Sequence, residues 1–313
     1  AVILATGGME YKPNEYLYGE DPDVMTHLEM DAVIRDEDER LDNAKSVVFV
    51  QCVGSRNEEN PYCSKVCCTH SLKSALAVKK MDRRKRVYVV YRDIRSYGFR
   101  EDLYKEAREL GVIFIRYDLD KMPSVRRNSN NDLEFTVIDH VLQMEVRINP
   151  DLLVLASGIS PNQNKRLFEM FKVPVNNEGF LVEAHAKLRP VDFASDGLFV
   201  AGLAHYPKPL EESIAQARAA VARAMTILSR DSLKVGGVVA DVTPEKCAVC
   251  LTCVRGCPYD IPYIHDDGYA KIDASECHGC GACVGECPGK AIKLNHFTDE
   301  QIIAKTDALF EKV

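Results

Sequence analysis

Residues 247–258 read CAVCLTCVRGCP, and residues 277–288 read CHGCGACVGECP. Both segments follow the pattern C-x2-C-x2-C-x3-C-P, and the second repeats the first 30 positions later. The pattern is typical of chains that bind two [4Fe–4S] clusters, because three closely spaced thiolates ligate one cubane and the cysteine before proline ligates the other. We therefore predict two clusters, one bound by Cys247, Cys250, Cys253 and Cys287, the other by Cys257, Cys277, Cys280 and Cys283.

Two other uses of cysteine fit this repeat less well. Zinc sites use two C-x2-C pairs rather than two quartets that each close with Cys-Pro. Disulfides are typical of secreted chains, and we expect no secretory signal here, because the apolar run at the start ends within five residues. The twelve cysteines therefore indicate metal ligation in a reducing cytoplasm.

The remaining composition is that of a globular protein. The chain has 313 residues, of which 46% are hydrophobic and 28% charged, and this length predicts two or three domains. The net charge of −7 argues against a nucleic-acid-binding surface. No apolar run approaches the ~18 residues of a membrane span. Position 1 is not Met, so we expect the chain to begin inside a domain.

Three short apolar runs end in glycine, and each predicts a buried strand of a parallel sheet. These runs are residues 1–8, 151–158 and 196–202. Glycine at the carboxyl end of such a strand is typical of a ligand crevice. Residues 46–158 alternate strand patterns with helix patterns at 64–80 and 100–110, which predicts a βαβ domain. Residues 9–45 are polar and acidic, and predict a connector with little regular structure.

The first strand-to-helix turn of this domain carries cysteines where a dinucleotide-binding domain carries G-x-G-x-x-G. The spacing is C-x10-C-x3-C-C: one cysteine ends the strand, and the others start a helix. There, Cys63 and Cys67 would share a helix face, and the helix dipole would lower the thiol pKa values. We predict a third [4Fe–4S] cluster, bound by Cys52, Cys63, Cys67 and Cys68. A zinc site or a redox-active cysteine pair is the open alternative.

The rest of the chain divides into three segments. Residues 159–236 return to the first sheet and include an alanine-rich helix over 211–229, whose N-terminus suits an anionic ligand group. Residues 237–296 form the ferredoxin-like module. Residues 297–313 predict a docking helix, amphipathic and begun by a capping box of Thr298 and Gln301.

Together these motifs resemble one family. They are ATGG at 5–8, CVGSR at 52–56, YCSKVCC at 62–68, GLFVAG at 197–202 and EESIAQA at 211–217, and they look like the A-type subunit of heterodisulfide reductase. The resemblance runs over the whole chain. It implies a thioredoxin-reductase-like, parallel-sheet flavoprotein that carries FAD and [4Fe–4S] clusters in the cytoplasm of anaerobes, methanogenesis included. In several members of the family the FAD bifurcates electron pairs.

The resemblance also implies roles for single residues. Thr6, Gly7 and Gly8 match a strand end that lies along the FAD, and Gly202 matches the glycine beside its ribityl-phosphate arm. Ser213 and Ile214 would direct main-chain N–H groups at the pyrimidine edge of the flavin. Lys73 would lie between cluster and flavin and tune the flavin potential, with an ordinary solvated lysine as the alternative. Leu203 stands where the family has an Asp after the Ala-Gly step, so the contact that this Asp makes in the family is weakened here.

The family's first glycine-rich FAD motif is missing from this sequence, so FAD would be shared with the missing N-terminal half or with a partner chain. We expect an oxidoreductase subunit that passes electrons between FAD, three clusters and other subunits, with substrate reduction in a partner. The expected partners are B- and C-type subunits, a hydrogenase- or formate-dehydrogenase-linked donor, ferredoxin, and a second copy of the chain. An FAD-free wiring subunit and a pyridine-nucleotide-dependent oxidoreductase are the alternatives.

Overall fold

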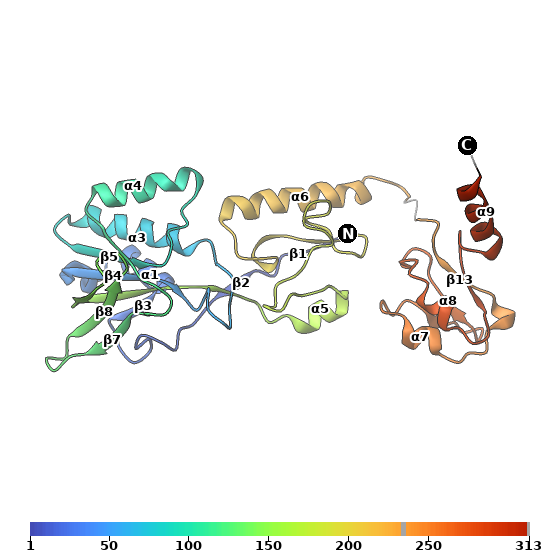
Figure 1. Ribbon diagram of the computed structural model, residues 1–313, viewed down its shortest axis with the longest axis horizontal. Coiled ribbons are helices and arrows are strands. Elements are labelled where there is room, and N and C mark those ends of the chain that lie inside the picture. The colour runs from blue at the N-terminus through green and yellow to red at the C-terminus, as the bar shows by residue number, and fades with distance from the viewer. Residues whose placement is uncertain (233–235, 312–313) are drawn as a thin grey trace.

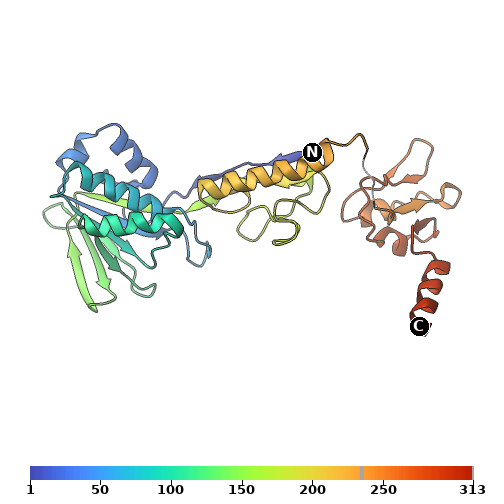
Figure 2. The same ribbon diagram turned by 90° about the horizontal axis from the view of Figure 1, so that it is seen from above.

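The computed structural model describes residues 1–232 and 236–311. The chain forms three parts that follow one another along the long axis of the molecule (Figures 1 and 2). A parallel-sheet domain lies at one end, a smaller unit around the helix α6 lies in the middle, and the cysteine-rich module lies at the other end. No helix in the described ranges is long and apolar enough to cross a membrane.

The parallel-sheet domain confirms the predicted βαβ architecture. Its sheet has the strand order β3-β10-β4-β5-β6, and every neighbouring pair is parallel. Because the strands are buried on both faces, their sequences are nearly continuous apolar runs. The strands are β3 (Val24–Thr26), β4 (Ser46–Val53), β5 (Arg86–Tyr91), β6 (Ile113–Arg116) and β10 (Leu152–Ser157).

Each face of this sheet is covered by its own layer (Figure 1). Phe49 and Leu152 pack with Leu72 and other side chains of the helical face, while Val48 and Leu153 pack with Phe135 on the opposite side. The helical layer contains α1 (His27–Arg35), α2 (Glu39–Asn43), α3 (Cys67–Met81), η1 (Gly98–Arg100) and α4 (Glu101–Glu109). The other layer is an antiparallel sheet of β7 (Ser124–Arg127), β8 (Leu133–Asp139) and β9 (Met144–Ile148).

The prediction that residues 9–45 lack regular structure is wrong. This segment contributes the edge strand β3 and the helices α1 and α2. Glu29 accepts the N–H of Thr26 at 2.7 Å and completes a capping box, while Met30 and Leu41 are fully buried. The elements are short, and acidic side chains on their outer faces hide the periodicity that would reveal them.

The middle unit is built on a single pair of parallel strands, β1 (Val2–Leu4) and β12 (Leu198–Val200). The helix α6 (Leu210–Leu228) lies along this pair, as Figure 2 shows, and closely matches the predicted helix. Leu4, Phe193 and Val200 form part of the small core of the middle unit. Other short elements are α5 (Lys165–Phe171) and η2 (Gly202–Ala204). Isolated bridges join Val175 to Leu181, His185 to Arg189 and Asp192 to Phe199.

A two-stranded ribbon joins these two parts. β2 (Gly8–Glu10) leaves the middle unit and pairs antiparallel with β11 (Ile159–Pro161), which returns to it. A Cβ atom at Gly8 would lie 2.9 Å from Ile159 Cγ2 and 3.0 Å from the Ser160 carbonyl oxygen. Glycine at position 8 therefore allows the two strands to approach each other.

The cysteine-rich module has internal two-fold character that follows its sequence repeat. Its helices α7 (Thr252–Gly256) and α8 (Ala282–Glu286) are 30 residues apart. The strands pair between and within the repeats: β13 (Ala240–Val242) with β16 (Ile292–Leu294), and β14 (Tyr263–Ile264) with β15 (Ala270–Lys271). The last helix, α9 (Asp299–Phe310), begins with the predicted capping box at Thr298, but all its side chains are exposed, so it does not dock on the described chain.

Replacing Gly8 by Ala is expected to reduce the free energy of unfolding by about 1–3 kcal/mol, because the added methyl forces the β2–β11 ribbon apart. Urea unfolding measures this loss. Gly285→Ala is the matched control, since a Cβ atom there meets nothing within 4 Å. Equal losses in the two variants would contradict the close approach.

Candidate iron–sulfur and flavin sites

The first cysteine site lies at the carboxyl edge of the parallel sheet. Cys52 is near the end of β4, Cys63 is in the following loop, and Cys67 and Cys68 form the first turn of α3. The helix begins at Cys67, so Cys63 does not share a helix face with it, contrary to expectation. Cys52 has a left-handed backbone, with φ of 64°, which turns the chain at the strand end.

Hydrogen bonds hold these side chains in place. The N–H of Lys65 donates to Cys63 Sγ at 3.3 Å, and the guanidinium of Arg56 donates to Cys52 Sγ at 3.8 Å. The thiols of Cys67 and Cys68 donate to main-chain carbonyls of Ser157 and Asp93, at 3.5 and 3.7 Å. All twelve cysteines of the chain are free thiols in this structure.

Burial, rather than the helix dipole, dominates the thiol pKa values at this site. Desolvation raises the pKa of Cys68 to about 11 and raises that of Cys67 well above its ordinary value. The negative charges of neighbouring cysteines raise the pKa of Cys67 further. The predicted lowering of these pKa values is therefore wrong for Cys67 and Cys68. If all four cysteines of the site are ionised, their negative charges need a compensating cation, which a metal centre supplies.

The repeated motif brings its eight cysteines together as two quartets. Each quartet lines its own small cavity, and the residue sets match the predicted ligand sets: Cys247, Cys250, Cys253 and Cys287 in one, and Cys257, Cys277, Cys280 and Cys283 in the other. As the side chains stand, no group of three or more His, Cys, Asp or Glu in residues 1–232 and 236–311 has the geometry to hold a metal ion. The ligand sets therefore rest on spacing and proximity.

Backbone conformation explains part of the cysteine spacing. Val249 and Leu251 have φ values of 54° and 63°, and the equivalent residues of the second repeat, Gly279 and Gly281, have φ values of 64° and 77°. A Cβ atom at Gly279 would lie 2.4 Å from the Val238 carbonyl oxygen. The chain thus wraps around each cavity in the same left-handed turns, and N–H groups of Ala270 and Ala291 donate to Cys247 and Cys287, both at 3.3 Å.

The residues predicted to contact FAD gather at one end of the middle unit. Thr6 and Gly7 follow β1, and Gly202 follows β12. Gly202 has φ of 73°, and a Cβ atom there would meet nothing within 4 Å, so a ligand group can approach its backbone. Ser213 differs from prediction, because its N–H donates to the Pro209 carbonyl at 3.0 Å inside α6. Ile214 lies deeper in the helix, so the N–H groups free for a ligand are those of 210–212.

Lys73 is exposed on α3 and lines a cavity between α3 and the start of α6. Arg100, Leu210 and Glu211 line the same cavity. The fold therefore brings Lys73 to the first turn of α6, although the two are far apart in the sequence. Its helix also carries Cys67 and Cys68 at its N-terminus.

A buried charged network behind Gly202 was not predicted from the sequence. Lys208 is 8% exposed and donates to Gly202 O at 2.8 Å, Gln216 Oε1 at 2.9 Å and His205 Nδ1 at 3.2 Å. Because Nδ1 accepts, the His205 ring carries its proton on Nε2 and donates to Glu183 at 2.6 Å. Burial, together with the nearby charge of Lys65, lowers the Lys208 pKa to about 8. A lysine between two prolines is the signal that could have indicated it.

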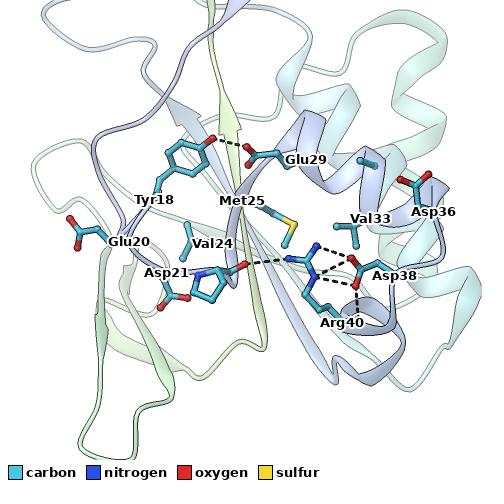
Figure 3. A pocket seen from close by; sticks show the side chains of 13 residues that line it. Tyr18, Glu20, Asp21, Val24, Met25, Glu29, Val33, Asp36, Asp38 and Arg40 are labelled. Atoms are coloured by element: carbon cyan, nitrogen blue, oxygen red, sulfur yellow. Dashed lines mark hydrogen bonds and ion pairs between the residues drawn. The ribbon is translucent and has the colours of Figure 1, made fainter.

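A separate cavity lies near the start of β3, far from these sites in the topology (Figure 3). Tyr18 donates to Glu29 at 2.6 Å across it, and Arg40 pairs with Asp38 at 2.8 Å. The residues before β3 that line this cavity are at the amino end of the sheet, whereas the cysteines are at the carboxyl end. Predicted site residues take no part in this cavity.

Comparisons with known proteins agree with this architecture. Residues 241–288 match the 4Fe-4S dicluster domain family. The chain is 36% identical to the A-type subunit of the H2/formate:CoB-CoM heterodisulfide, ferredoxin reductase of Methanococcus maripaludis, over 98% of this chain and 50% of that protein. It is 35% identical to the iron-sulfur A-type subunit of the CoB–CoM heterodisulfide reductase of Methanocaldococcus jannaschii, over 99% of this chain and 50% of that protein.

Among solved structures, a thioredoxin reductase of T. acidophilum aligns with 73% of this chain and 66% of its own, at a TM-score of 0.49 and 11% identity. That likeness is slight, and the α/β class rests on the strand order itself.

The parallel-sheet domain and the 4Fe-4S dicluster domain define an iron–sulfur protein. More particularly, over nearly its whole length the chain is similar to heterodisulfide reductase A-type subunits, at 34–36% identity. It spans about half the length of the curated relatives it matches.

Replacing Lys208 by Met is expected to destabilise the protein by about 1–3 kcal/mol, because buried acceptors on Gly202 and Gln216 lose their donor. The native pKa of about 8 is below the ordinary value of 10.5, so the unfolded chain binds more protons between these values. Wild-type stability relative to the variant therefore rises as the pH increases from about 8 to about 10.5.

Thermal unfolding across this pH range measures the difference for Lys208→Met. Lys187→Met, at an exposed position, is the control and is expected to change little. A stability difference that stays constant from pH 7 to pH 10.5 would contradict the depressed pKa.

Proposed function

We propose that this chain is the electron-transfer core of a heterodisulfide-reductase-like complex, in which electrons pass between FAD, three [4Fe–4S] clusters and partner subunits. The observation that carries the proposal is the pair of cysteine sites on one chain of this family. Eight cysteines belong to the dicluster module, and four more meet at the carboxyl edge of the parallel sheet.

The third cluster is proposed on the chemistry of the four-cysteine site. Its sulfurs come from β4, a loop and α3, and two of them are buried. Their raised pKa values disfavour free thiolates, so thiolates persist here only with a cation among them. Cysteine thiolates are the ligands that iron–sulfur clusters prefer, and a cubane takes four of them. A zinc ion remains the competing occupant, and the iron content decides between the two.

FAD is proposed at the end of the middle unit. The open backbone at Gly202 and the free N–H groups at the start of α6 fit an anionic or hydrogen-bonding group of a cofactor. The buried hydroxyl oxygen of Thr6 has no partner among the described residues. When bound, FAD would exchange electrons in pairs or singly. Thr6, Gly7, Gly8 and Gly202 would hold it, with the free N–H groups of residues 210–212 at its ring.

The middle unit leaves apolar surface for further polypeptide. Val2 and Ile3 of β1 are more than one third exposed, although parallel strands are normally covered. One side of α6 exposes a stripe of large apolar side chains: Leu210, Ile214, Val221, Met225 and Leu228. In the described ranges β1 pairs with β12 alone. We infer that the remaining part of the flavin-binding unit covers this surface, from a missing N-terminal half or from a partner chain.

The proposed partners are those of the relatives' complexes. The relatives are named as subunits of heterodisulfide reductases linked to H2, formate or ferredoxin. By analogy, we propose B- and C-type subunits, a hydrogenase- or formate-dehydrogenase-linked donor and ferredoxin, with a dimer of this chain in a cytoplasmic complex. Bifurcation at the FAD belongs to the same proposal. If no FAD binds, the chain would be a subunit that transfers electrons through its clusters alone. The exposed strand β1 favours this alternative, because in the described ranges the flavin-binding unit does not cover it.

The protein purified anaerobically with its natural partners is expected to contain about twelve iron and twelve sulfide per chain and one FAD, because three cubanes hold four of each. Iron, sulfide and flavin quantification measures this. A content of about eight iron, with zinc present, would contradict the third cluster, and absence of flavin would leave the wiring subunit.

Matched variants assign the iron to its sites. Cys63→Ala is expected to remove up to four iron without affecting the dicluster module, and Cys250→Ala to affect the module alone. Equal iron loss from both sites in either variant would show that the folds, rather than the ligands, had failed.

Replacing Lys73 by Ala is expected to lower the flavin midpoint potential, because a positive charge near the ring stabilises the reduced, anionic flavin. Lys73→Arg keeps the charge and should retain most of the potential. Lys80→Ala is the control, since Lys80 is on the same helix but pairs with Glu106 at 2.7 Å. Spectroelectrochemical titration measures the potentials, and equal values for wild type and Lys73→Ala would rule the role out.

A further inference from the structure

The four-cysteine site differs from the dicluster module in the groups that face its sulfurs. Among the described residues, the nitrogen donors to dicluster sulfurs are main-chain N–H groups, such as those of Ala240 and Ala270. At the four-cysteine site, Cys63 also accepts a main-chain N–H. Cys52 faces the guanidinium of Arg56 instead, with Nη1 at 3.8 Å from Sγ. A full positive charge therefore lies against one ligand position of the proposed third cluster.

Arg56 is fixed in this position by contacts on all sides. Its N–H donates to Tyr62 O at 3.0 Å, and its carbonyl accepts from Arg92 Nη1 at 2.7 Å. Its backbone is left-handed, with φ of 59°, a conformation that non-glycine residues adopt only where the surroundings impose it. The side chain is only 16% exposed, so water screens its charge less than that of a surface arginine.

Asp93 completes the arrangement from the loop after β5. Its Oδ2 lies 2.6 Å from Arg56 Nη2 and 3.6 Å from Arg95 Nη2, while its carbonyl accepts from the thiol of Cys68. The Asp93 carboxylate therefore lies between two guanidinium groups, those of Arg56 and Arg95. Asp93 is 44% exposed, so solvent screens its charge more than that of Arg56.

We propose that Arg56, positioned by Asp93, raises the reduction potential of the four-cysteine cluster. The inference rests on the third cluster of the proposed function. The cluster gains one electron that FAD or another cluster loses, and its negative charge increases by one. A fixed positive charge beside a ligand sulfur stabilises that reduced state, and arginine keeps its charge at every working pH. Arg56 thus favours electron arrival at this site, and Asp93, which acts through Arg56, is the positioning residue.

Charge variants of the full chain, with its clusters assembled anaerobically, test this inference. EPR-monitored redox titration follows the signal that disappears in Cys63→Ala. Arg56→Gln is expected to lower the potential by about 59 mV or more, a tenfold change in the reduced-to-oxidised ratio at a fixed potential. Asp93→Asn keeps a side-chain oxygen that can accept from Arg56 Nη2 but removes a negative charge, so it is expected to raise the potential. Arg56→Lys should restore most of the wild-type value, and the dicluster signals should not move.

The outcomes separate this inference from the proposed function. Opposite shifts in Arg56→Gln and Asp93→Asn, with about twelve iron retained, support it. Unchanged potentials, or shifts of the same sign in both variants, overturn it and leave the third cluster in place. Wild-type protein with only about eight iron overturns the third cluster itself, and the inference with it.

Discussion

Burial of cysteine sulfur is the constraint on which the rest of this structure depends. Cys67, Cys68, Cys253 and Cys283 are buried, and desolvation raises their thiol pKa values. An isolated buried thiolate is too costly to persist, which is why the proposal places several sulfurs around a shared cation at each site. The backbone is left-handed at Val249 and Leu251, which line one cavity with Cys247, Cys250 and Cys253, and at Cys52 in the other cysteine region. Both cysteine regions therefore contain residues other than glycine with positive φ.

The parallel-sheet domain supports one of these regions and shows how a ligand edge can be adapted. Its strands are buried on both faces, and the turn after β4 has the position of a nucleotide-binding loop. Cysteines stand there in place of glycines, and Arg56, Arg92 and Asp93 surround them with fixed charges. Proteins set the potentials of iron–sulfur clusters by net charge, hydrogen bonds and exposure, and all three vary between this site and the dicluster module.

The middle unit leaves large apolar side chains uncovered. It joins the parallel-sheet domain through the β2–β11 ribbon, where Gly8 allows close approach, and it faces α3 through the first turn of α6. Its own core is small, and apolar side chains of β1 and α6 are exposed. The loop that follows Gly202 has a polar interior, in which Lys208 donates to Gly202 O and His205 donates to Glu183. Polypeptide that covered the α6 stripe, as proposed, would bury this apolar surface and stabilise the unit.

The sequence by itself determined the elements whose signal is local. Cysteine spacing predicted the two quartets that the structure gathers, and apolar runs ending in glycine predicted β1, β10 and β12. Only the tertiary structure decided the contacts between residues that are far apart in the sequence. It brought Lys73 to α6, Arg56 to Cys52 and Lys208 to Gly202, and it made a strand and two helices of residues 9–45. Ligand spacing and strand burial act between near neighbours in the chain, whereas desolvation, charge pairing and the burial of short elements depend on surfaces that meet only after folding.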